Sequence, residues 1–370
     1  MGLSIALLAG EAGLRLLRFR PVSILRPDIR KTYRLEPGAQ FHYRGYLPGN
    51  FEDFDNLVTL NRHGFHDRDY SPQRPVAGAF RLVVLGDSYV AAFEVPIEDT
   101  FHKRLEARLG AEDPFARPLY EVIALGLPRK AQADQLQWLR QFGPAYQPDA
   151  VLLLFFSGND ILENSPALFG QAMDFATRYM ATVVPAKIAF FDYLDLVPGS
   201  RLGGFLAETA TTLYARNLDR FSNQVSRADL LSPELGLYAD PLAPGWREAW
   251  ERTASLLAEI AATCERLGAT FLVAGLSGPQ AIGDASSERT WSSAATGALD
   301  LGRGDRWIAA WTKGANVPFL HLTPTLSAAG PRRVFWRHDA HLTAHGHAIV
   351  AAQAYDFAVK TLAGAARARP

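Results

Sequence analysis

Ser88 stands where a buried strand is expected to end, which raises the question of why such a strand should present a hydroxyl. Residues 82–85 form an apolar run, and Gly86, Asp87 and Ser88 follow it directly. Gly86 permits a tight turn, so Ser88 is expected at the start of the next helix. A serine at that boundary commonly caps the helix. It can also be a nucleophile whose developing oxyanion is met by backbone N–H groups. This stretch alone leaves both interpretations open.

A second group of polar residues follows the apolar run at residues 151–156. Ser157, Gly158, Asn159 and Asp160 come there in succession. An asparagine beside a glycine often bonds to its own backbone in a turn. Its side-chain amide can alternatively donate a hydrogen bond to a developing negative charge, which a carboxylate cannot do. Asn159 is therefore a candidate for stabilising an oxyanion.

The candidate base lies near the C-terminus, in the sequence WRHDAHLTAHGHAIVAA. A nucleophilic serine needs a base, and the base needs an orienting partner. His341 and Asp339, separated by one residue, offer this pair. The segment holds four of the nine histidines, His338, His341, His345 and His347, which raises a metal site as an alternative. No His-Glu-x-x-His pair occurs and no cysteine is near, so the serine base is favoured and no metal is expected.

Alternating strands and helices would have to position these residues. Continuous apolar runs, typical of strands buried on both faces, occur at 82–85, 122–125, 151–156, 271–274 and 319–322. Helical patterns occur at 100–109, 131–142, 247–267, 306–311 and 343–362. The alternation predicts an α/β fold with a mostly parallel sheet covered on both faces. Reactive groups of such sheets collect at the carboxyl ends of the strands, where Ser88 and Asn159 stand.

The charge balance gives no reason to expect a nucleic acid as partner. Among 370 residues, 38 are basic and 38 are acidic, and 48% are hydrophobic, which is enough for a sizeable core. Without a linker or a repeat, one domain carrying an insertion is expected. Cys264 is the single cysteine and lies in a helical pattern, where a buried apolar role is expected and no intramolecular disulfide can form.

Residues 1–31 read as an apolar and basic helix, a candidate membrane anchor. The uncharged apolar stretch covers only residues 2–10, whereas a spanning helix needs about 20 apolar residues. Basic residues follow it: Arg15, Arg18, Arg20, Arg26, Arg30 and Lys31. An interfacial helix on an anionic membrane surface and a helix packed on the domain both fit. The expected location is a membrane surface or the cell envelope, with a cytoplasmic location left open.

The chain resembles the SGNH hydrolases, also called the GDSL esterase and lipase superfamily, and within it bacterial members with an N-terminal apolar segment. The resemblance covers most of the chain. It rests on Gly86-Asp87-Ser88, on the Gly-Asn-Asp of 158–160, on Asp-x-His at 339–341 followed by LTAHGH, and on the upstream element NRHGFHDRDY at 61–70. It implies a flavodoxin-like three-layer α/β/α sandwich with a mostly parallel sheet and no cofactor. The hydrolase-like domain would span 32–370, with a helical insertion at about 161–246.

The resemblance also implies roles for individual residues. Ser88 is the expected nucleophile, His341 the general base and later acid, and Asp339 the residue that orients His341. The implied oxyanion donors are the backbone N–H of Ser88, the side chain of Asn159 and a backbone N–H from the loop after the second strand.

That loop departs from the family pattern. The subgroup's second loop glycine falls at Arg129, while the earlier glycine is kept as Gly126. A side chain there restricts the loop where glycine would adopt a positive φ. Either Gly126 or Arg129 is expected to complete the oxyanion hole. The Arg129 guanidinium would lie in solvent or meet an anionic substrate.

The expected reaction is hydrolysis of an ester, either an O-acyl group on a carbohydrate or a lipid-like ester. Single-residue spacing between aspartate and histidine also occurs in relatives that move acyl groups onto polysaccharides, so O-acyl transfer through the same acyl-serine is an alternative. A noncatalytic carbohydrate- or lipid-binding relative is another. Aromatic residues of the insertion could form a lid or acyl pocket, or the insertion's own core: Phe169, Phe175, Tyr179, Phe190, Phe191 and Tyr193.

Overall fold

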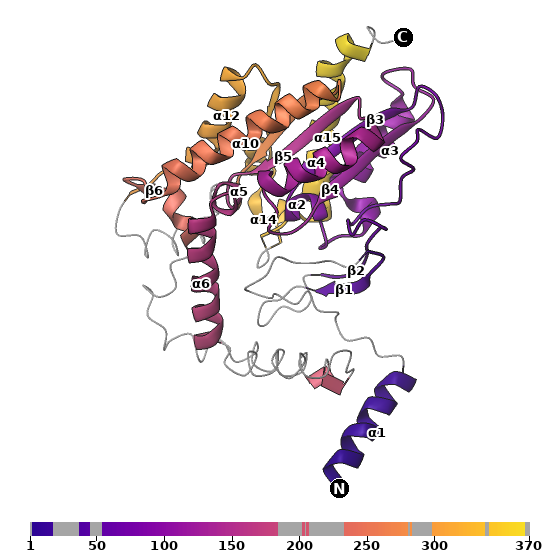
Figure 1. Cartoon of the computed structure of the whole chain (residues 1–370), viewed down its shortest axis with the longest axis vertical. Helices are drawn as coiled ribbons and strands as arrows, with labels where there is room; N and C mark the ends of the chain where they lie inside the picture. Colours follow the sequence, from indigo (N-terminus) through magenta and orange to yellow (C-terminus); the bar gives the residue numbers. More distant parts are fainter. Residues whose placement is uncertain are drawn as a thin grey trace.

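The centre of the molecule is a five-stranded parallel sheet (Figure 1). This computed structural model describes residues 2–17, 37–44, 54–183, 202–203, 205–206, 233–279, 282, 298–336 and 340–366. The strands are β3 (Phe80–Gly86), β4 (Tyr120–Gly126), β5 (Ala150–Phe156), β7 (Thr270–Leu276) and β9 (Phe319–His321). All neighbouring pairs are parallel, in the order β4-β3-β5-β7-β9. Counted along these strands the order is 2-1-3-4-5, that of flavodoxin-like sheets. The predicted strands and the parallel sheet are confirmed.

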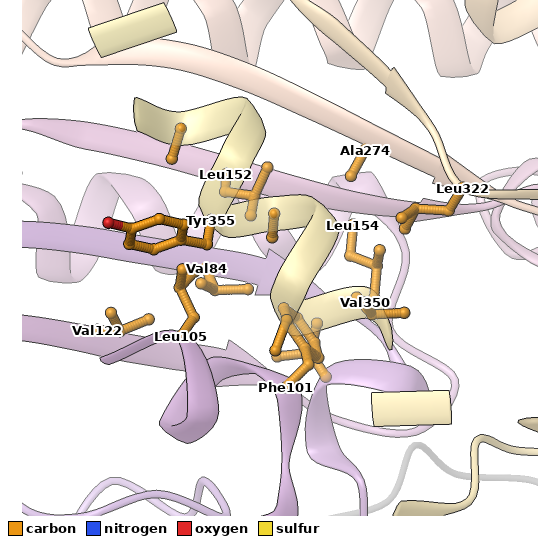
Figure 2. Close-up of a cluster of buried hydrophobic side chains, with 14 of the residues drawn as sticks. Val84, Phe101, Leu105, Val122, Leu152, Leu154, Ala274, Leu322, Val350 and Tyr355 are labelled. Atoms are coloured by element: carbon orange, nitrogen blue, oxygen red, sulfur yellow. The ribbon is translucent and has the colours of Figure 1, made fainter. Parts of the chain in front are cut away.

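One face of the sheet is covered by α3 (Phe101–Glu112) and α15 (Ala344–Ala366). Leu82 and Val84 point to this face, since alternate residues of a strand lie on opposite sides. Figure 2 shows how helix side chains meet the strands there. The cluster includes Val84, Val122, Leu152, Leu154 and Ala274 from the strands, with Phe101, Leu105, Val350 and Tyr355 from the helices.

The other face is covered by α4 (Gln132–Tyr146), α10 (Trp246–Arg266) and α12 (Arg303–Gly314). Val83 and Leu85, the alternate residues of β3, pack on this side. Cys264 of α10 is buried in the same cluster, and burial raises the pKa of its thiol to about 12, so the predicted buried apolar role is confirmed. Helices on both faces confirm the three-layer arrangement.

A small antiparallel hairpin of β1 (Gln40–Arg44) and β2 (Asp55–Thr59) lies beside the sheet (Figure 1), and the sequence patterns did not predict it. Its apolar side packs against the turn that follows the first strand of the sheet. Phe41, Val58 and Leu60 contact Ala91 and Phe93 in a separate buried cluster. The hairpin therefore supports the segment that contains Ser88.

Short elements connect the layers. They are α2 (Ser88–Ala91), η1 (Ile97–Asp99), α5 (Asp160–Glu163), η4 (Pro233–Leu237), α13 (Thr323–Ala328), α14 (Pro331–Val334) and the paired strands β6 (Ala239–Asp240) and β8 (Ala298–Leu299). The predicted insertion begins with α5 and α6 (Pro166–Val183), and α6 extends away from the sheet (Figure 1). Of its aromatic side chains, Phe169 packs on the second-face cluster. The side chains of Phe175, Tyr179, Phe190, Phe191 and Tyr193 lie outside the described part of the chain.

The N-terminal segment forms the helix α1 (Gly2–Leu16), which is the first part of the helix predicted over residues 1–31. Residues 18–31 lie outside the described residues. Glu11 of α1 accepts a hydrogen bond from the Leu202 backbone N–H at 2.8 Å. Among the described helices, none combines the length and the apolar character needed to cross a membrane. The membrane role of this segment stays a prediction.

Candidate active site

Ser88 is the first residue of α2 and follows the carboxyl end of β3. The order of the sheet changes direction at β3, because β4 lies on one side of it and β5 on the other. Ligands of open α/β sheets bind at this switch point. The helix cap is supplied by Asp87, whose side chain accepts from the Tyr89 backbone N–H at 3.0 Å. Because Asp87 does the capping, the Ser88 hydroxyl is available for another partner. Of the two interpretations of Ser88, the structure therefore excludes the cap.

The partner of Ser88 is His341. Ser88 Oγ and His341 Nε2 lie 2.8 Å apart, a contact between residues 253 positions apart in sequence. Tyr89 holds the loop before His341 in place, since its hydroxyl donates to the Ala340 carbonyl at 2.8 Å and its ring lies 5.0 Å from the imidazole. Ala340 adopts φ 70°, and the Trp336 N–H donates to the His341 carbonyl at 2.8 Å. These contacts of Ala340 and His341 thus present the imidazole to the hydroxyl.

A carboxylate that the sequence patterns did not single out lies on the other side of the imidazole. Glu94 Oε1 is 3.2 Å from His341 Nδ1, and the Glu94 side chain is only 3% exposed. Asp339, the predicted orienting residue, lies outside the described residues. One signal in the sequence could have identified Glu94, namely a single carboxylate within the otherwise apolar run AAFEVP at 91–96.

Two glycines allow α2 to sit on the strand ends. A Cβ at Gly86 would come within 2.3 Å of Val90 Cγ2, and a Cβ at Gly126 within 2.5 Å of Val90 Cβ. Gly126 therefore lies directly beside the helix that begins with Ser88. Arg129, at the position of the missing loop glycine, is exposed and adopts φ 59°. The loop thus keeps the left-handed conformation that favours glycine, at a cost in strain. Which of the two residues completes the oxyanion hole stays a prediction.

Asn159 precedes α5 at the end of β5. Its side-chain amide lies within hydrogen-bonding reach of the Asp87 carboxylate. Burial raises the pKa of Asp87, and the hydrogen bond from Asn159 acts in the opposite direction. Its Nδ2 also lies 3.3 Å from Glu163 Oε1. The structure thus places the predicted oxyanion donor next to the residue that precedes Ser88, although the donor role itself stays a prediction.

Asp87 and Asp160 form a buried acidic pair beside these residues. Burial raises the pKa of both carboxyls, and the Asp87 charge raises that of Asp160 further. Asp160 Oδ2 accepts from the Phe156 N–H and from Gln132 Nε2, both at 2.9 Å. Asp160 thereby ties the end of β5 to α4.

The upstream element at 61–70 contacts the segments that surround Ser88. His66 donates through Nδ1 to the Ala91 carbonyl at the end of α2, at 2.7 Å. Asp67 accepts from the Ala124 N–H of β4 at 2.7 Å and pairs with buried Lys103 at 2.7 Å. This element therefore anchors α2 and β4, the two segments that meet around Ser88.

The C-terminal histidines that the structure describes have different surroundings. His347 is buried and its Nδ1 accepts from the Phe101 backbone N–H at 3.2 Å, whereas His345 is exposed. His338 lies outside the described residues. Across the described ranges, no group of three or more His, Cys, Asp or Glu side chains could hold a metal ion.

Comparisons with known proteins gave remote structural similarity only. No protein-family model matches the chain, and no curated protein is detectably similar in sequence. The chain is similar to the acetyl xylan esterase AlAXEase, with 14% identity over 75% of this chain and 98% of that one and a TM-score of 0.40.

Two further solved structures are similar at the same level. For the psychrotrophic esterase EstA from Pseudoalteromonas sp., the identity is 12% over 76% of this chain and 98% of that one, with a TM-score of 0.39. For the lipase/acylhydrolase from Enterococcus faecalis, the identity is 12% over 77% and 96%, with a TM-score of 0.38. Similarity of this size assigns neither a family nor an activity to the chain.

Proposed function

We propose that this protein is a serine ester hydrolase in which Ser88 forms an acyl-enzyme and His341 is the general base. The observation that carries the proposal is the 2.8 Å contact between Ser88 Oγ and His341 Nε2 at the carboxyl end of β3. Ser88 is partly exposed, so a substrate carbonyl can reach it. A protein that only binds a ligand needs no base in contact with its serine, which favours catalysis over the binding alternative.

The proposed reaction has two halves with the same proton path. Ser88 Oγ bonds to the ester carbonyl carbon as its proton passes to His341 Nε2, and the carbonyl oxygen becomes an oxyanion. The oxyanion collapses as the bond to the leaving alcohol breaks, and the alcohol takes the proton from Nε2. Water then loses a proton to Nε2 as it attacks the acyl-serine, and Ser88 regains that proton when the acid departs.

The proposed oxyanion donors are the backbone N–H of Ser88, the amide of Asn159 and a backbone N–H from Gly126 or Arg129. Donors of this kind act most strongly at a site that excludes water. The proposed substrate is an O-acyl group on a carbohydrate or a lipid-like ester. A polysaccharide hydroxyl in place of water would make the same acyl-serine an intermediate of acyl transfer.

Mass spectrometry of the intact protein tests the proposal. Wild type is incubated with a fluorophosphonate probe and, separately, with p-nitrophenyl acetate, beside Ser88→Ala and His341→Ala. Matched controls are Ser71→Ala and His345→Ala, which remove exposed residues of the same types. We expect one adduct on wild type and on both controls, none on Ser88→Ala and strongly slowed labelling of His341→Ala. A folded wild type that forms no adduct would refute the proposal.

A further inference from the structure

The imidazole of His341 lies between a hydroxyl and a buried carboxylate. Nε2 is 2.8 Å from Ser88 Oγ, and Nδ1 is 3.2 Å from Glu94 Oε1. A neutral imidazole carries its proton on only one nitrogen, and the partner of the other nitrogen decides which. A carboxylate accepts hydrogen bonds, so Glu94 favours the proton on Nδ1. Nε2 is then the acceptor that a general base must offer to Ser88.

The backbone on both sides of Glu94 is held by the β1–β2 hairpin. Asn56 of β2, which is buried, donates through Nδ2 to the carbonyl oxygens of Phe93 and Val95 at 2.9 and 2.6 Å. The Phe93 ring packs edge-on against Phe41 of β1, with centroids 5.5 Å apart. These contacts fix the residues before and after Glu94. The backbone around Glu94 therefore holds its carboxylate towards His341.

The charge that develops during the reaction gives this contact its importance. When Ser88 passes its proton to Nε2, the imidazole becomes a cation next to a Glu94 side chain that is only 3% exposed. Opposite charges interact more strongly away from water, so the carboxylate stabilises the imidazolium more than the neutral ring. No proton needs to move to Glu94. Its effect is to set the tautomer and to stabilise the protonated base.

We propose that Glu94 is the carboxylate that positions and charge-stabilises His341. This inference rests on the proposed function, since it assigns Glu94 to the same reaction. It differs from the expectation that Asp339 alone orients the histidine. The hairpin acquires a function in consequence, because Asn56 holds the turn from which Glu94 reaches the base.

The central experiment compares Glu94→Gln with Glu98→Gln. Both variants replace a glutamate by glutamine, and the two positions are four residues apart in the sequence. Glu98, however, is exposed, whereas Glu94 is buried. Asp339→Asn is measured in parallel. The readouts are the rate of fluorophosphonate labelling of Ser88, and kcat and KM for p-nitrophenyl acetate between pH 5 and 9. Replacing the orienting carboxylate of a serine hydrolase by an amide lowers kcat by as much as about 10⁴-fold.

For Glu94→Gln we expect kcat and the labelling rate to fall at least about 10²-fold with little change in KM, because the loss affects the transition state. The acid limb of the pH–rate profile should move to lower pH, since a nearby carboxylate favours the protonated imidazole. Glu98→Gln should match wild type. Glu94→Gln with wild-type labelling, kcat and pH profile would overturn the inference, as would a loss confined to Asp339→Asn.

A measurement on the unaltered protein covers the case in which Glu94→Gln does not fold. Histidine-selective ¹⁵N NMR at pH 8, with the His341 signals assigned from His341→Ala, reports which ring nitrogen carries the proton. We expect the proton on Nδ1, and a proton on Nε2 would overturn the inference. A wild type that is never labelled would instead refute the proposed function, so the two failures are distinguishable.

Discussion

His347 provides a prediction about acid stability that can be worked out from the structure. Its imidazole is buried, accepts from the Phe101 N–H at 3.2 Å and stacks on the Phe101 ring. Burial, helped by the charge of nearby His341, lowers the pKa of His347 from 6.5 to about 3. The folded protein therefore requires this ring to be neutral, whereas the unfolded chain lets it protonate in the ordinary range.

The sign and size of the effect follow from linkage. Because the pKa of His347 is lower in the folded state, its contribution to stability is complete above pH 6.5 and is lost as pH falls towards 3. Each unit by which the pH falls within that window lowers the free energy of unfolding by about 1.4 kcal/mol. At pH 5 the solution is about 1.5 pH units below the pKa of 6.5 that the ring has in the unfolded chain. Protonation of the unfolded chain between pH 7 and pH 5 therefore lowers the free energy of unfolding by about 2 kcal/mol.

The perturbation is His347→Gln, whose side-chain oxygen can still accept from Phe101 but does not titrate. Unfolding by urea is measured for both proteins from pH 5 to 7.5, and the variant is compared with wild type at each pH. The comparison removes the titration of other buried groups. Burial lowers the pKa of His66 and His102 in the same direction, whereas it raises the pKa of Asp67 and Asp160.

The destabilisation caused by His347→Gln should shrink by about 2 kcal/mol on going from pH 7 to pH 5. His345→Gln is the control, because it removes an exposed imidazole from the same helix that loses little hydration on folding. A difference between wild type and His347→Gln that is constant over the whole pH range would refute the reasoning. It would mean that the unfolded chain and the folded protein protonate this ring alike.

Three further predictions concern the candidate site. His341→Ala and Ser88→Ala should each remove most turnover of p-nitrophenyl acetate. The double variant should lose little more, since the effects of mutating residues that act as one unit are not additive. A double variant whose loss is the product of the two single losses would contradict a shared mechanism. Arg129→Gly should raise the free energy of unfolding by up to about 1 kcal/mol, because it relieves the backbone strain at φ 59°; destabilisation in urea unfolding would argue against that strain. Gly126→Ala should cost about 1–3 kcal/mol and slow Ser88 labelling, because the new methyl meets Val90, and Val90→Ala should restore part of both.

Much of the fold was readable from local patterns. A strand buried on both faces must be apolar along its whole length, and every residue of β3 and β4 is buried. The five runs therefore marked the strands, and their alternation with helices implied a parallel sheet. Ser88 and Asn159 could be placed because the carboxyl ends of parallel strands share one edge. The β1–β2 hairpin was missed, since its two five-residue strands carry only a short pattern.

The sequence by itself determined the properties that depend on neighbours along the chain, namely strand ends and helix periods. It also predicts, without deciding, that Ser88 and His341 act in one reaction. Only the tertiary structure decided that Asp87 caps α2 and that Glu94 faces His341. The Glu94 contact joins two distant segments, and its geometry is set by packing of the hairpin and by the hydrogen bonds of Asn56. No local pattern encodes such a contact, because the residues that hold Glu94 in place come together only when the chain is folded.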